Sequence, residues 1–182
     1  MKAKVTFVLV PVASFLAIVS ANLIRAQQAK ISAEANAALR YFLQVDCEID
    51  TPGQALTGLL KFPELIPALV QVLQQGPDAE TIRENDRLLE EQWNSREQFL
   101  GTQRDLGLTE QQLQTARQTT KEAYVKTARE QFIRKYRQKA AVGLAAFNTA
   151  EAQKALRTAA NDPDESLRTV VKAAQVKYQK KK

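Results

Sequence analysis

The chain has 182 residues and a formal net charge of +6, with only six glycines and six prolines among many good helix formers. It contains no histidine, which excludes an imidazole base, a Ser–His or Cys–His pair and any His-containing metal site. Long alternating runs of Val, Ile and Thr are missing from the sequence, so we expect an all-α fold.

The first predicted element is an apolar run of twenty uncharged residues, Val5 to Ile24. A helix of that length spans about 30 Å, the thickness of a bilayer's hydrocarbon core. Two lysines precede the run, and Val19-Ser20-Ala21 places small residues before a possible signal-peptide cut. We predict that residues 1–26 are a transmembrane anchor or a signal peptide, with a buried core helix as a third alternative. The anchor is favoured because the run is longer than a typical signal core.

Residues 27–182 are expected to form one extramembrane, all-helical domain. An apolar stripe from Ile24 to Val45 predicts a helix that leaves the bilayer and packs along this domain, with a membrane-surface helix as the alternative. We expect a single-pass membrane protein with its N-terminus inside and its soluble part extracytoplasmic.

Turn and cap residues divide the rest of the domain. Thr51-Pro52 indicates a helix start, and a compact apolar helix from Pro67 should stop at Gly76-Pro77. A polar helix of about Asp78 to Leu106 should follow.

The next predicted boundary lies at Gly107, before a capping box of Thr109 and Gln112 that begins a helix from Glu110 to about Phe147. The short link predicts a long antiparallel helix hairpin over about 78–148. A last break at 161–165 should begin the C-terminal helix.

Charge is divided between the two halves of the predicted domain. Residues 47–108 hold eleven acidic and five basic residues, whereas residues 109–182 hold seven acidic and sixteen basic ones. We therefore expect an acidic helix to lie against a basic one within the hairpin.

Basic residues gather between 126 and 139, interleaved with Phe132 and Tyr136. This pattern can bind an anionic partner through charge and stacking. The structural alternative places the two aromatic rings, four residues apart, toward the core, with a solvated basic back. The residues predicted to bind a partner are Lys126, Arg129, Arg134, Lys135, Arg137 and Lys139.

The expected partners are the membrane, other protein subunits and anionic lipid, and not nucleic acid, which would require a cytoplasmic domain. No catalytic, cofactor-binding or metal-binding residue is predicted. The only cysteine, Cys47, lies among three carboxylates that disfavour its thiolate. We thus expect a non-enzymatic accessory or scaffold subunit of a membrane assembly.

A second hypothesis comes from Leu108-Thr109-Glu110-Gln111-Gln112, which resembles the LTxxQ phrase of small periplasmic helical chaperones and stress-sensor proteins. The resemblance covers five residues and implies an exported, all-helical protein with a cleaved signal peptide and a basic surface. The long helix after the leader and the proline-rich middle depart from that plan.

N-terminal sequencing of the mature protein separates the two hypotheses. We expect Met1 to be retained, because the apolar run continues through Leu23 and Ile24. A mature chain that begins at Asn22 would contradict the tether and favour the exported chaperone.

Overall fold

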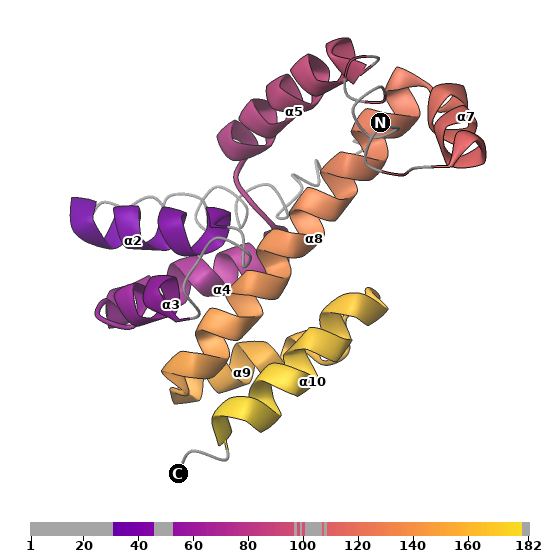
Figure 1. Ribbon diagram of the computed structural model, residues 1–182. Helices are drawn as coiled ribbons and strands as arrows, with labels where there is room; N and C mark the ends of the chain where they lie inside the picture. The colour runs from indigo at the N-terminus through magenta and orange to yellow at the C-terminus, as the bar shows by residue number, and fades with distance from the viewer. Residues whose placement is uncertain are drawn as a thin grey trace, which may run out of the picture.

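The computed structural model describes residues 31–45, 53–96 and 109–179, together with Gln98, Leu100 and Gly107. This part of the chain is helical and contains no strand, which confirms the all-α prediction. Figure 1 shows the helices arranged around the long helix α8. The helices are α2 (Ala33–Gln44), α3 (Gln54–Leu59), α4 (Ile66–Gln75), α5 (Ala79–Asn94), α7 (Glu110–Gln118), α8 (Lys121–Phe147), α9 (Ala150–Ala159) and α10 (Glu165–Gln179), with a 3-10 turn η1 at Pro63–Leu65.

Several predictions fall on residues outside this description. They are the anchor or signal at 1–26, the environment of Cys47 and the helix start at Thr51-Pro52. Among the described residues, no helix combines the length and the apolar character that crossing a bilayer requires.

Side-chain caps begin and end helices where the sequence indicated. Thr109 and Gln112 form the predicted capping box at the start of α7. Asp164 accepts two backbone N–H groups from the first turn of α10, and α4 stops at Gly76. The first and last turns of a helix leave backbone N–H and C=O groups without a partner in the helix. In these cases a side chain accepts from such N–H groups, or a glycine lets the chain turn away at the helix end.

The single helix predicted from 110 to 147 is wrong, because the structure divides it into α7 and α8. Thr119 is extended, with ψ of 131°, and ends α7. The Thr120 hydroxyl then accepts a hydrogen bond from the Ala123 N–H at 3.2 Å and begins α8. A threonine side chain competes for backbone hydrogen bonds, so it favours a cap over a helix interior.

The polar helix α5 is also shorter than predicted, since it ends at Asn94 and not near Leu106. Beyond its end, the Arg96 guanidinium lies 4.2 Å from the centre of the Trp93 ring and donates to the Ala116 carbonyl of α7. Arg96 thus links the end of α5 to α7.

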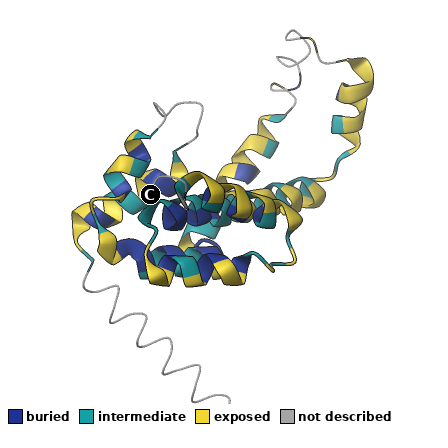
Figure 2. Cartoon of the chain, turned by 90° about the horizontal axis from the view of Figure 1, so that it is seen from below, coloured by how far each residue is buried: buried dark blue, intermediate teal, exposed yellow. Residues whose placement is uncertain are grey.

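Helix α8 is the axis of the fold, because it packs against α2, α4, α5, α9 and α10. Buried residues gather in the body formed by these contacts, whereas α5 and α7 are mostly exposed (Figure 2). Large side chains excluded from solvent in this core include Leu59, Leu65, Leu69, Leu144, Leu156, Leu167 and Val171.

The N-terminal half of α8 lies antiparallel to α5. Arg129 Nε donates to Asp86 Oδ1 at 2.7 Å, and the ring centres of Trp93 and Tyr124 are 5.5 Å apart. Asp86 thus contacts Arg129, whereas Trp93, further along α5, contacts the earlier residue Tyr124 of α8. The acidic helix therefore lies against the basic one, as the charge distribution predicted.

Gly143 allows α8 to approach the body closely, and α8 continues through it to Phe147. A Cβ atom here would lie 3.0 Å from Leu59 Cδ2, 3.1 Å from Phe42 Cε1 and 3.3 Å from Leu69 Cδ1. These three side chains come from α3, α2 and α4 and are themselves buried, so they have little room to move.

We expect Gly143→Ala to destabilise the protein by about 1–3 kcal/mol, because overpacking outweighs the gain in helix propensity. Gly58→Ala is the matched control: Gly58 lies in α3 with nothing within 4 Å of a built Cβ. It should stabilise the protein by about 0.5–1 kcal/mol. Urea unfolding followed by circular dichroism measures both, and equal stabilities would contradict the close approach.

Candidate functional site

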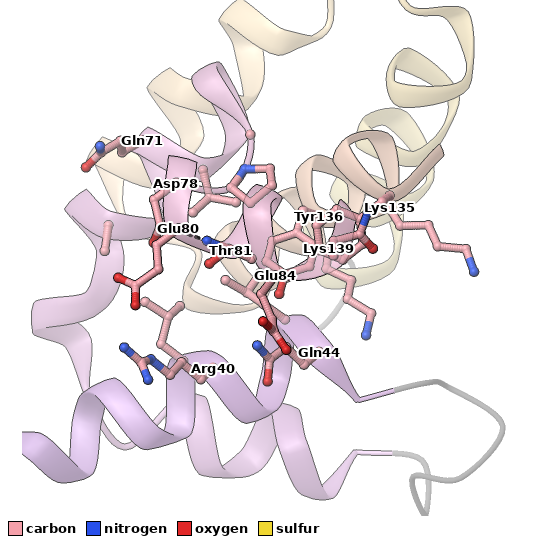
Figure 3. Close-up of a pocket in the computed structure, with 18 of the residues that line it drawn as sticks. Arg40, Gln44, Gln71, Asp78, Glu80, Thr81, Glu84, Lys135, Tyr136 and Lys139 are labelled. Atoms are coloured by element: carbon pink, nitrogen blue, oxygen red, sulfur yellow. Dashed lines mark hydrogen bonds between the residues drawn. The ribbon is translucent and has the colours of Figure 1, made fainter. Parts of the chain in front are cut away.

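A cleft of about 900 Å³ opens between α2, α4, α5 and α8. It is bounded on several sides but open to solvent, and Figure 3 shows its polar side chains entering from different helices. Its volume lies within the usual range of binding sites in proteins, about 300–1,000 Å³.

The cleft exists because the chain turns sharply between α4 and α5. Gly76 has φ of +80° and ψ of −165°, a backbone conformation that side chains other than hydrogen disfavour. A Cβ atom at Gly76 would also lie 2.9 Å from Ile133 Cγ2 of α8. Pro77 follows and Asp78 caps the next helix, so α5 leaves the body in a new direction (Figure 1).

Apolar side chains form much of the cleft lining. Leu88 is the most exposed of them, at 44% of its full accessible area, and it projects from a helix that is otherwise mostly polar. Its neighbour Leu89 is buried. The main apolar lining residues are Ile31, Leu39, Leu43, Val72, Leu88 and Phe132.

Charged side chains around the cleft are separated by sign. Arg40 on α2 and Lys135 and Lys139 on α8 supply positive charge. On the other side, α5 supplies Glu80 and Glu84, with Asp78 at its N-cap. Figure 3 shows the two glutamates pointing from α5 toward the side formed by α2.

Tyr136 of the lining is buried, and so is the amide nitrogen of the half-buried Asn85. Burial raises the pKa of Tyr136, and nearby Asp78 raises it further, while a hydrogen bond with Gln44 and the charge of Arg40 lower it in part. The Asn85 amide nitrogen is buried without a hydrogen-bond partner among the described residues. Buried polar groups of this kind are uncommon in folded proteins.

Four of the six residues predicted to bind a partner hold the fold together. Arg129 pairs with Asp86, and Arg134 Nε donates to Asp164 Oδ2 at 2.8 Å. The remaining two are Arg137, which pairs with Asp162 and donates to the Leu73 carbonyl, and Lys139, which donates to the Val45 carbonyl.

The other two predicted residues have no ion-pair partner within the described part of the chain. Lys126 and Lys135 are both exposed on α8. Only Lys135 and Lys139 among the six line the cleft. The six therefore do not act as one free basic face, and partner binding by each stays a prediction.

The two aromatic residues between these basic positions face the core, as the structural alternative to partner binding predicted. Tyr136 is buried, Phe132 packs against the core, and their ring centres are 4.7 Å apart.

The turn between α9 and α10 shows why Arg134 and Arg137 are engaged. Burial alone would raise the pKa of Asp162, but hydrogen bonds from Arg137 and the Asp164 backbone outweigh it, so this pKa is below its ordinary value. The pKa of Asp164 is lowered in the same way: burial opposes the charge, while Arg134 and backbone donors of α10 stabilise it. These pairs tie α8 to the C-terminal helices.

Among the described residues, no group of three or more His, Cys, Asp or Glu side chains lies close enough together to hold a metal ion. Comparisons with protein families, with characterised proteins and with solved structures found no match for this chain. Functional inference therefore depends on the cleft itself.

Sequence patterns pointed to Lys135 and Lys139 but not to the cleft. The usable signal was the Leu88-Leu89 pair, because consecutive residues point about 100° apart around a helix, so two adjacent leucines give α5 a wider apolar face than a single buried edge. In the structure Leu89 is buried and Leu88 is exposed at the cleft.

We expect Arg137→Met to destabilise the protein by about 1–3 kcal/mol at pH 7, because Asp162 and the Leu73 carbonyl lose their donor. Since the pKa of Asp162 is lowered on folding, its pairing stabilises the protein above the ordinary value of 3.8. That stabilisation is lost as pH falls through the lower folded-state pKa. The difference between wild type and variant should therefore shrink below about pH 4.

Arg157→Met is the control, because Arg157 is exposed on α9 and has no ion-pair partner in the described part. It should change stability by less than about 0.5 kcal/mol at any pH. Thermal unfolding at pH 7 and pH 3 measures both variants, and a pH-independent cost of Arg137→Met would refute the ion-pair assignment.

Proposed function

We propose that the protein is a non-enzymatic, membrane-tethered accessory or scaffold subunit that binds a partner protein through its helical body. The observation that carries this proposal is the cleft between α2, α4, α5 and α8, with apolar side chains inside and charged ones around it. The apolar run of residues 5–24 supports the tether.

An apolar surface left open to water is costly, and in folded proteins it commonly marks a place where another molecule binds. Leu88 illustrates this, since it is nearly half exposed and lines the cleft together with the partly buried Phe132 and Val72. A partner that covered these groups would remove apolar area from water at about 25 cal/mol per Å².

An exported chaperone is the second candidate function. The same open cleft favours it, because a chaperone needs an apolar surface that can hold unfolded segments. The two functions differ in the N-terminus of the mature chain and in selectivity: a subunit retains one partner, whereas a chaperone binds many segments weakly.

Leu88→Glu tests the proposed role of the cleft. A carboxylate here places charge among the apolar groups, so the native partner should no longer co-purify in mild detergent. The fold should survive, because Leu88 is 44% exposed. Leu60→Glu is the matched control: Leu60 is 39% exposed and does not line the cleft. If both variants retain the partner, the cleft is not its binding site.

A further inference from the structure

We propose that the cleft binds one amphipathic α-helix of a partner protein, which carries acidic residues on one flank and basic residues on the other. This inference rests on the proposed function, since it names the class of partner that the cleft would take. Its basis is the separation of charge between the walls of the cleft.

The shape of the cleft suits a helix. Three helices, α2, α5 and α8, supply lining residues one or more turns apart, such as Leu39 and Leu43 on α2 and Phe132 and Tyr136 on α8. Rows of side chains at this spacing form ridges and grooves that accept the ridges of another helix. An amphipathic helix recognises such a groove through apolar residues at positions i, i+3, i+4 and i+7.

The side of the cleft formed by α2 and α8 favours an acidic flank. Arg40 and Lys135 are exposed and make no ion pair with any described residue. Their charges are therefore available to a partner. Lys139, which donates to the Val45 carbonyl, adds a third positive charge on the same side.

The side formed by α5 favours a basic flank. Glu80 is exposed and has no ion-pair partner in the described part of the chain. Glu84 is held by Arg87 through two hydrogen bonds of 2.6 and 3.0 Å, and Asp78 caps α5 through the Thr81 N–H. The negative N-terminal turn of α5 thus faces the cleft across from the positive residues.

This negative wall argues against a uniformly anionic occupant. A phospholipid headgroup or a nucleic-acid backbone would be attracted to Lys135 but repelled by Glu80 and Glu84. A helix with both signs of charge satisfies both walls. Complementary charges at a binding site also fix the orientation of the partner.

The test selects helical peptides on the full-length protein in mild detergent. The display library has peptides about four turns long, with leucines fixed at i, i+3, i+4 and i+7 and the flanking positions randomised. We expect enriched peptides to combine Asp or Glu on one flank with Lys or Arg on the other, and Leu88→Glu to abolish the enrichment.

Charge-reversal variants then test which wall of the cleft binds the acidic flank of the peptide and which wall binds the basic flank. Lys135→Glu and Glu80→Lys should each weaken an enriched peptide about fivefold to tenfold. The matched controls Lys126→Glu and Glu130→Lys, at exposed positions of α8 outside the cleft, should leave its affinity within about twofold. A peptide with its acidic flank changed to lysine should recover affinity for Lys135→Glu but not for wild type.

Several results would overturn the proposal. These are no enriched peptide, enriched peptides with one sign of charge, or equal effects of reversal at Lys135 and Lys126. If no peptide is enriched but the protein binds phosphatidylglycerol vesicles through Lys135, the cleft is a lipid-binding site and the proposal is wrong. If the native partner binds through the cleft but lacks a two-signed helix, the proposed function stands and this inference fails.

Discussion

Close packing of α8 against α2, α3 and α4 is the constraint on which the rest of the structure depends. It is possible because the C-terminal half of α8 is lined with small residues: Ala140, Ala141, Gly143 and Ala145 are all buried. The backbone of α8 can therefore approach side chains such as Leu59 and Leu69 closely. With α8 fixed in this way, its N-terminal half extends beyond the body and provides the surface along which α5 lies.

Ion pairs hold the outer helices at defined positions on this axis. Arg129 and Lys121 reach acidic residues of α5, while Arg134 and Arg137 reach aspartates before α10. Exposed pairs of this kind contribute little stability individually, but they set which helices face one another. The positive charge of α8 is used mainly for this internal pairing, which leaves Lys135 as the unpaired α8 cation at the cleft among the described residues.

Local sequence patterns predicted the helices well where a cap or a glycine marks the boundary. The capping box at Thr109, the stop at Gly76 and the cap at Asp164 all lie where expected. The break before Thr120 was missed because a threonine inside a helix-forming stretch is common, and only the backbone shows that it caps. The cleft could not be predicted in the same way, since Leu43, Leu88 and Phe132 lie far apart in sequence and line one cleft only once α2, α5 and α8 have packed.

The position of α5 has a consequence for how quickly a partner can bind. This helix is joined to the body at one end by the tight Gly76-Pro77 turn and braced along its length by the Asp86–Arg129 pair and the Trp93–Tyr124 contact. These contacts hold α5 against α8 and so set the distance between two walls of the cleft. If the cleft takes the partner helix proposed above, ordering of the receptor would cost little conformational entropy, and the collision rate and the charges of Arg40, Lys135 and Glu80 would govern capture.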